Sequence, residues 1–256
     1  MSKATAVITG ASVGIGAEFA RKLAKEYNLI LIARNKDKLE ELKSSLDCES
    51  QVIVADLSVA AEVAKVEKTL KKDSSISLLV NNAGFGTAGE FHTLDLESEL
   101  QEINLNVMAL VRLSHAVLPN LVAKKGGAII NVSSVASFLV TPLSTTYSAT
   151  KAYVRSFSES LAAEVNQYGV TVQALCPGLT RTEFQERAGL NTDVVPDFMW
   201  MTSAQVVDES LAKIASKQPV VVPGIINDIS AKLAKIIPGR LLAGFTQNIM
   251  TNAIKK

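Results

Sequence analysis

Short apolar runs rich in β-branched residues recur along the chain. They show little polar alternation, which is typical of parallel strands that helices cover on both faces. Seven runs of this kind predict strands at residues 6–9, 29–33, 51–55, 77–81, 128–132, 170–175 and 219–223.

Segments with the apolar spacing of an amphipathic helix separate these runs. The first has its apolar stripe at Ala17, Ala20, Leu23, Ala24 and Tyr27, and the next two gaps hold residues 39–46 and 61–72. Strands that alternate with helices favour the α/β class. We predict a doubly wound, mostly parallel seven-stranded sheet with right-handed crossovers and helices on both faces.

Length and composition indicate one domain. The chain has 256 residues, of which 48% are apolar and 20% charged, and it lacks a repeat, a low-complexity tract or a Pro/Gly-rich linker. We therefore expect a single domain over residues 1–256. A formal net charge of +1 gives no nucleic-acid footprint. Because Cys48 and Cys176 stand far apart and only two histidines occur, we expect neither a disulfide framework nor a metal site.

The start of the chain shows no targeting signal. Its first apolar run is too short for a signal peptide, and the sequence lacks an apolar stretch long enough for a membrane span. We expect a cytoplasmic protein.

The stretch TGASVGIG, residues 9–16, links the first predicted strand to the first predicted helix. A loop in this place lies at the carboxyl edge of the sheet, where backbone amides and the helix dipole favour an anion. Glycine lets the main chain turn tightly and approach a pyrophosphate without a Cβ in the way. We predict that Gly10, Gly14 and Gly16, with Ile15 between them, contact a dinucleotide. Their spacing departs from the usual G-x-G-x-x-G, and a plain strand-to-helix turn is the alternative.

Arg34 follows the second predicted strand, where folds that select NAD carry an acidic residue for the ribose 2′-hydroxyl. A guanidinium there would pair with a 2′-phosphate, and the hydroxyl of Ser12 would donate to the same group. A solvated arginine at a strand end is the alternative. We predict NADP(H) as the cofactor in preference to NAD.

Tyr147 and Lys151 lie four residues apart, which places both side chains on one face of a helix. A phenol with an ordinary pKa of about 10 needs roughly 4 kcal/mol to ionise at neutral pH. A lysine cation about 4 Å away supplies on the order of 4 kcal/mol at an effective dielectric constant of about 20. The pair is therefore suited to acid and base chemistry, although such pairs also arise by chance on helix surfaces.

Seven segments occur together in an order and spacing that one known family shares. They are TGASVGIG at 9–16, Asp56-Leu57, NNAG at 81–84, Asn106, Ser134, YSATK at 147–151 and CPGLTRT at 176–182. Ser134 also stands 13 residues before Tyr147, as in that family. Together these segments resemble the short-chain dehydrogenase/reductase family, which has a Rossmann-like fold. The resemblance covers nearly the whole chain and implies an NADP-preferring oxidoreductase that interconverts a carbonyl and an alcohol by hydride transfer.

The resemblance also implies roles for the catalytic pair. Tyr147 would be the general acid in reduction and the base in oxidation. Lys151 would lower the pKa of Tyr147 and hold the nicotinamide ribose hydroxyls. Further cofactor contacts are implied for Asp56 and Leu57 at the adenine, for Asn81, Ala83 and Gly84 beside the adenine ribose, and for Pro177, Gly178, Thr180 and Thr182 at the nicotinamide.

Two further catalytic residues follow from the same resemblance. Ser134 would donate a hydrogen bond to the substrate oxygen as negative charge develops there, with its neighbour Ser133 as the alternative. Asn106 would hold a water molecule that passes protons to Lys151. Asn104 is its rival, and a cap or a helix-bending polar residue is the structural alternative.

The segment 183–205 is rich in large apolar residues such as Phe184 and Trp200, and in this family such a segment folds over the substrate. We predict an apolar lid that suits a lipophilic carbonyl compound, because closure expels water from the path of the hydride. Ordinary packing is the alternative. The sequence names no particular substrate.

Residues 225–256 combine an apolar stripe with five basic residues against Asp228 alone. We predict a C-terminal helical extension that covers the substrate cleft or a subunit interface in preference to an anionic membrane surface. Pro238 would end or kink its helix. We also expect a homodimer or a homotetramer.

We therefore rank three candidate functions. The first is an NADP(H)-dependent oxidoreductase acting on a small-molecule carbonyl or alcohol. The second is a non-catalytic protein of the same fold that senses NADP or serves as a scaffold. The third is a membrane-associated reductase of lipid or steroid carbonyls.

Overall fold

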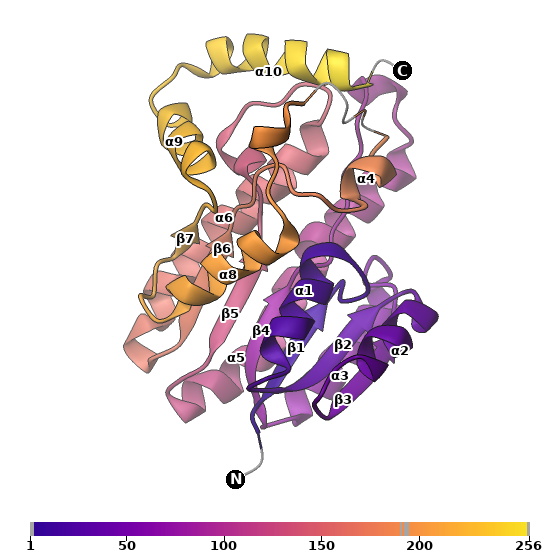
Figure 1. The fold of residues 1–256 in the computed structure, drawn as a ribbon, viewed down its shortest axis with the longest axis vertical. Coiled ribbons are helices and arrows are strands. Elements are labelled where there is room, and N and C mark those ends of the chain that lie inside the picture. The colour runs from indigo at the N-terminus through magenta and orange to yellow at the C-terminus, as the bar shows by residue number, and fades with distance from the viewer. Residues whose placement is uncertain (1–2, 190, 192–194, 255–256) are drawn as a thin grey trace.

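A parallel sheet of seven strands forms the centre of the molecule (Figure 1). The structure, a computed structural model, describes residues 3–189, 191 and 195–254. The strands are β1 (Thr5–Thr9), β2 (Asn28–Ala33), β3 (Ser50–Val54), β4 (Ile76–Asn81), β5 (Ala128–Val132), β6 (Thr171–Leu175) and β7 (Val220–Val221). Their order is β3-β2-β1-β4-β5-β6-β7, and every neighbouring pair is parallel. The predicted α/β fold and all seven predicted strands are confirmed.

Helices cover both faces of this sheet because successive strand residues point to opposite sides. Ala6 and Ile8 of β1 pack into one core, and Val7 between them packs into the other. The first core is closed by α1 (Gly14–Leu23), α2 (Lys36–Ser44) and α8 (Ser203–Ile214). The second is closed by α3 (Ala60–Lys72), α5 (Leu110–Lys124) and α6 (Thr145–Val165).

The first helix is shorter than its apolar stripe predicts. It ends at Leu23, so that Ala24 is its C-cap and Tyr27 lies beyond it. The amide of Tyr27 still donates to the carbonyl of Leu23 over 2.9 Å, but the next amide, of Asn28, already pairs with Ala4 at the start of β2. The chain leaves the helix here because the second strand has to begin.

One long helix on the sheet is interrupted by a π-helical turn. It consists of α4 (Leu96–Ile103), the π-helix η2 (Asn104–Ala109) and α5. In the described chain this is the one helix that is long and apolar enough to cross a membrane, and half of its most apolar window is buried. Its α5 part packs on β4 and α3, as a core helix does.

Short helical elements lie in the connections between these strands and helices. They are η1 (Phe91–Thr93), η3 (Val135–Phe138), η4 (Asn166–Tyr168), α7 (Phe184–Arg187) and η5 (Asp197–Met199). After β7, α9 (Ile225–Ala234) and α10 (Gly239–Ile254) lie at the end of the molecule farthest from the N-terminus (Figure 1). Pro238 separates the two helices, as predicted. Residues 190 and 192–194 of the predicted lid, and residues 255–256 of the predicted tail, lie outside the described residues, as do residues 1–2.

The turn before β5 requires glycine at position 127. A substitution there tests whether this turn sets the position of β5, the strand that leads to the site. Gly127 has φ +101°, and a Cβ on it would lie 2.6 Å from the carbonyl oxygen of Ser77. We expect Gly127→Ala to lower the free energy of unfolding by about 2–4 kcal/mol through strain and overpacking. Gly126→Ala is the matched control, because its Cβ would meet no atom within 4 Å, and it should change stability by less than about 0.5 kcal/mol. Equal denaturant midpoints for the two variants would contradict this account of the turn.

Candidate active site

The glycine loop at the carboxyl end of β1 has no room for side chains at the predicted positions. Gly10 and Gly14 have φ +64° and +57°, which favours glycine. A Cβ on Gly16 would lie 2.2 Å from the carbonyl oxygen of Gly10, and one on Gly14 would lie 3.0 Å from Thr182 Cγ2. The loop therefore presents bare backbone at the N-terminus of α1, next to Thr182, as a dinucleotide pyrophosphate requires.

Asn82 and Thr9 hold this loop, and sequence reasoning missed both. The amide nitrogen Nδ2 of Asn82 donates to the carbonyls of Thr9 and Gly10 over 3.0 and 3.2 Å. The hydroxyl of Thr9 accepts from the backbone amides of Asn82 and Ala83 over 2.9 and 3.0 Å. The signal was the second asparagine of the NNAG segment, because a loop that lacks side chains needs a partner for its carbonyls.

Asn81, the first asparagine of that segment, points into the sheet. Its Nδ2 donates to Ser114 Oγ over 3.0 Å and to Asn131 Oδ1 over 2.9 Å, and the residue is 5% exposed. Only its main chain is left to face the predicted adenine ribose. Leu57 is likewise buried in the core between the sheet and α3, and Ile15 packs against the other core.

Arg34 and Asp56 meet at the ends of β2 and β3. Arg34 Nη1 lies 3.7 Å from Asp56 Oδ2, and 70% of the arginine side chain is exposed. Burial tends to raise the pKa of Asp56, but hydrogen bonds from Ser58 and the nearby guanidinium together hold it below its ordinary value. The arginine therefore keeps donors available at this edge of the sheet, where it is predicted to meet a 2′-phosphate.

Tyr147, Ser134 and Lys151 converge as predicted. The hydroxyl of Ser134 lies close enough to the phenol of Tyr147 to lower its pKa. Lys151 Nζ lies 5.7 Å from the centre of the Tyr147 ring and donates to the carbonyl of Val132 over 2.9 Å. Ser133, the alternative to Ser134, is buried and donates instead to the carbonyl of Lys151 over 2.7 Å.

The pKa of Tyr147 differs from the expected one. Burial is the main cause that raises the pKa of Tyr147 to about 12; Ser134 opposes this rise, and the carboxylate of Glu102 adds to it. Burial also lowers the pKa of Lys151 to about 8. The pKa of Tyr147 is therefore raised where the sequence predicts a lowered one, because burial is the largest effect on the phenol.

Asn106 lies in the π-helical turn and is 2% exposed, whereas its rival Asn104 is exposed. Its Nδ2 donates to the carbonyl of Phe85 over 2.9 Å and to Thr150 Oγ1 over 3.1 Å, and its Oδ1 accepts from the amide of Phe85 over 3.2 Å. Asn106 thus ties the loop after β4 to α6. A Cβ on Gly84 would lie 2.9 Å from Asn106 Oδ1 and 3.4 Å from Lys151 Nζ, so this part of the site is tightly packed.

Residues 177–184 form a wall beside the predicted catalytic groups. The carbonyl of Pro177 accepts from Val135, and the hydroxyl of Thr180 donates to the carbonyl of Gly178 over 3.1 Å. The ring of Phe184 lies 5.4 Å from that of Tyr147. A Cβ on Gly178 would lie 2.4 Å from Asn227 of α9, so the C-terminal extension packs against this wall.

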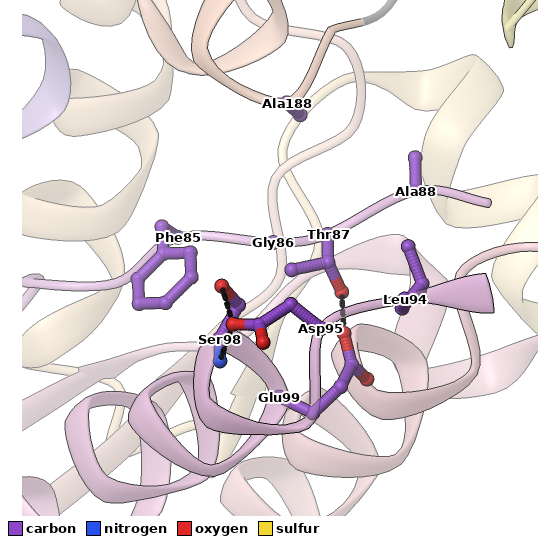
Figure 2. A pocket seen from close by; sticks show the side chains of 9 residues that line it. All are labelled: Phe85, Gly86, Thr87, Ala88, Leu94, Asp95, Ser98, Glu99 and Ala188. Carbon is purple, nitrogen blue, oxygen red and sulfur yellow. Dashed lines mark hydrogen bonds between the residues drawn. The ribbon is translucent and has the colours of Figure 1, made fainter. Parts of the chain in front are cut away.

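A cavity of about 290 Å³ opens beside the loop of residues 85–88 (Figure 2). Gly86 lines it and also contacts the phenol, since a Cβ on Gly86 would lie 2.7 Å from Tyr147 Cδ2. Ala188 lies across the cavity from the α4 residues in Figure 2. The full lining is Phe85, Gly86, Thr87, Ala88, Leu94, Asp95, Ser98, Glu99 and Ala188.

Two glutamates of α4 near this cavity were also missed. Glu99 and Glu102 are 4% and 0% exposed, and both contact Thr87. The signal was their helical spacing: with Asn106 they form a polar stripe on the face that a core helix turns inward. Over the part of the chain that the structure describes, no three metal-ligating side chains gather.

Comparison with known proteins agrees with this geometry. Residues 4–193 match the short chain dehydrogenase family. The very-long-chain 3-oxoacyl-CoA reductase of Mus musculus is 31% identical over 264 residues, covering 98% of this chain and 82% of that protein. The inactive hydroxysteroid dehydrogenase-like protein 1 of Homo sapiens is 37% identical over 179 residues, or 67% of this chain, and the match spans only 54% of the human protein.

A solved structure extends the similarity to the fold. The short-chain dehydrogenase from Sphingobium yanoikuyae in complex with NADPH has a TM-score of 0.81 and 34% sequence identity. The match covers 92% of this chain and 96% of that protein. The chain therefore belongs to the short-chain dehydrogenase family of oxidoreductases.

Proposed function

We propose that this protein is an NADP(H)-dependent reductase of bulky, lipophilic carbonyl compounds. The observation that carries the proposal is one phenol, Tyr147, with the hydroxyl of Ser134 beside it, the ammonium group of Lys151 5.7 Å from the centre of its ring, and a cavity next to it. This arrangement provides a proton donor, a second donor to the substrate oxygen and a nearby cation.

The residues present fit a dinucleotide. Gly10, Gly14 and Gly16 leave backbone where side chains would clash, and Gly84 does the same beside Lys151. Arg34 would hold the 2′-phosphate, which is our reason to propose NADP(H), and the relative solved with NADPH is consistent with this choice. The chemistry that NADPH supplies when bound is the donation of a hydride to a carbonyl carbon.

The protein's own groups manage the proton. A phenol whose pKa is about 12 is protonated at neutral pH, which is the form that a general acid needs. Lys151, with a pKa of about 8, is mostly charged there and would stabilise the phenolate after transfer. Ser134 would donate to the substrate oxygen. The predicted water at Asn106 belongs to this proposal.

The substrate class follows from the walls of the site. Phe184 and the apolar part of the cavity favour an apolar substrate, and the carboxylates of Asp95 and Glu99 disfavour an anionic group in the cavity. The mouse relative is named for a very-long-chain 3-oxoacyl-CoA, and its long acyl chain supports a lipophilic carbonyl compound here. A cytoplasmic homodimer or homotetramer, with residues 183–205 as its lid, completes the proposal.

Replacing the phenol tests the chemistry. We expect Tyr147→Phe to lower kcat/KM for ketone reduction by roughly 10²–10⁴-fold, because the general acid is lost. The rate is measured by NADPH absorbance with a panel of bulky ketones. Tyr153→Phe is the control, since Tyr153 lies on the same helix but is 45% exposed and stacks on Phe157. Equal rates for the wild type and Tyr147→Phe would refute the mechanism, and a wild type inert toward the whole panel would favour a non-catalytic NADP-binding protein.

Cofactor preference rests on Arg34. We expect Arg34→Asp to weaken NADPH binding by about 1.5–3 kcal/mol, or roughly 10- to 150-fold, and to leave NADH binding nearly unchanged, because a charge-assisted bond is lost. Fluorescence titration with both cofactors measures this. Arg21→Asp serves as the control, because Arg21 pairs with Glu18 on the surface of α1. An unchanged ratio of the NADPH and NADH affinities would mean that the 2′-phosphate binds at another place than Arg34.

A second candidate, a membrane-associated reductase of lipid or steroid carbonyls, is favoured by the outer face of α9. Ile225, Ile229, Leu233 and Ile236 recur at helical spacing and are 80%, 52%, 50% and 81% exposed. Lys232 and Lys235 are exposed on the same segment. An exposed apolar face with basic neighbours suits an anionic lipid surface.

Charged substitutions on this face separate the two candidates. If the second candidate is right, the wild type sediments with anionic liposomes and the double variant Ile229→Glu, Leu233→Glu does not, because carboxylates oppose insertion. Glu164→Gln on α6 is a surface control. The same variants are run by size-exclusion chromatography with light scattering. If the wild type does not bind liposomes, and the double variant no longer forms an oligomer that the wild type forms, the face is assigned to a subunit interface.

A further inference from the structure

Glu99 and Glu102 are buried carboxyl groups that the proposed chemistry does not use. Both lie on α4, and they are 4% and 0% exposed. Burying two carboxylates side by side is costly unless their oxygens find hydrogen bonds or one of them carries a proton. Their hydrogen bonds therefore reveal how the pair is accommodated.

The contacts at Thr87 require one extra proton. Thr87 Oγ1 lies 2.5 Å from Glu99 Oε1 and 3.0 Å from Glu102 Oε2. A threonine hydroxyl carries one hydrogen, and an ionised carboxylate only accepts. Both contacts are hydrogen bonds only if one carboxyl group is protonated and donates to Thr87. Figure 2 shows the Thr87–Glu99 contact at the edge of the cavity.

The remaining contacts favour Glu102 as the protonated member. Glu99 accepts from two hydroxyl groups, those of Thr87 and Thr146. Glu102 Oε2 accepts from the amide of Thr87 and lies 3.0 Å from its hydroxyl, and Glu102 Oε1 is buried without a partner among the described residues. A neutral carbonyl oxygen tolerates such a position better than a carboxylate oxygen does. Burial also raises the pKa of Glu102 to about 7.

This pair holds both sides of the catalytic tyrosine. Thr87 follows Gly86, which packs against the ring of Tyr147. Thr146, which donates to Glu99, directly precedes Tyr147 at the start of α6. A change at the carboxyl pair therefore reaches the phenol through the loop on one side and through the helix on the other.

We propose that Glu102 is a positioning residue that works as a neutral acid: it donates to Thr87, holds the 85–88 loop against Tyr147, and on losing its proton places a negative charge beside Tyr147 and Lys151. The electrostatic part of this inference rests on the proposed function of Tyr147. The proton count at Thr87 stands without it.

The charge of Glu102 interacts with three titratable groups, Glu99, Lys151 and Tyr147. Glu99 on the same helix raises the pKa of Glu102, and Lys151 from α6 lowers it, both less than burial raises it. In return, the ionised Glu102 raises the pKa of Tyr147 and of Lys151. Above neutral pH, Glu102 thus makes the phenol a weaker acid and keeps the ammonium group charged.

Glu102→Gln tests the charge, because glutamine mimics the neutral acid and retains a donor for Thr87. In alcohol oxidation, kcat/KM rises with pH as the phenol loses its proton. We expect Glu102→Gln to shift this rise to lower pH by about one unit, so that the variant oxidises the alcohol severalfold faster than the wild type at alkaline pH. Glu97→Gln, exposed on the same helix, should follow the wild-type profile. Superimposable profiles for Glu102→Gln and the wild type would overturn the proposed influence on Tyr147.

A second measurement needs no activity. Since the pKa of Glu102 is raised in the folded protein, its stabilising contribution is complete below the ordinary glutamate pKa of about 4.3 and is lost as the pH rises through about 7. We expect the denaturant midpoint of the wild type to fall relative to that of Glu102→Gln between about pH 5 and about pH 8. Parallel midpoints would overturn the shared proton. If the wild type has no turnover, the proposed function fails, and this measurement still decides the protonation of Glu102.

Discussion

The burial of the Lys151 ammonium group is the constraint on which the arrangement of this site depends. The residue is 4% exposed, and its Nζ donates to the carbonyl of Val132, the last residue of β5. A buried cation needs acceptors and a counter-charge, since loss of hydration otherwise drives off its proton. The end of β5, the position of α6 and the neighbouring phenol are therefore coupled through one side chain. The lowered pKa of Lys151 measures how incompletely its surroundings replace water.

Polar side chains stiffen the carboxyl half of an otherwise apolar sheet. Asn81 and Asn131 are register partners on β4 and β5, and they bond to each other and to Ser114 and Ser158 of the covering helices. Most polar atoms of this buried network find a partner within it, although Asn81 Oδ1 has none. The network joins strands to helices directly under the catalytic groups. Asn106 likewise joins two elements by hydrogen bonds, the loop after β4 and α6.

The electrostatics of the site balance one buried cation against carboxyl groups on α4. Lys151 alone would favour the phenolate, whereas burial and the charge of Glu102 favour the protonated phenol. In the protein alone this balance favours the protonated phenol. The charges of a bound cofactor and substrate add to those of the chain in setting the protonation of the phenol.

Local pattern determined most of the fold. Continuous β-branched runs placed all seven strands, because they are short and are separated by segments with helical spacing. The glycines at 10, 14 and 16 and the Tyr147–Lys151 pair were also readable, since a bare loop and one helical turn are local features. Local pattern did not reveal where the first helix ends, because the start of β2 decides that through its pairing with neighbours.

The tertiary structure alone decided the direction of the Tyr147 pKa, the inward side chain of Asn81 and the contacts of Asn82 and Glu102. Each of these depends on burial or on a partner that lies far away in the chain: Asn82 reaches Gly10, and the hydroxyl of Thr146 reaches Glu99. Sequence by itself determined which residue types stand at the edge of the sheet and at what spacing. It did not determine how much water each one loses, because desolvation is a property of the packed elements together and not of any one segment.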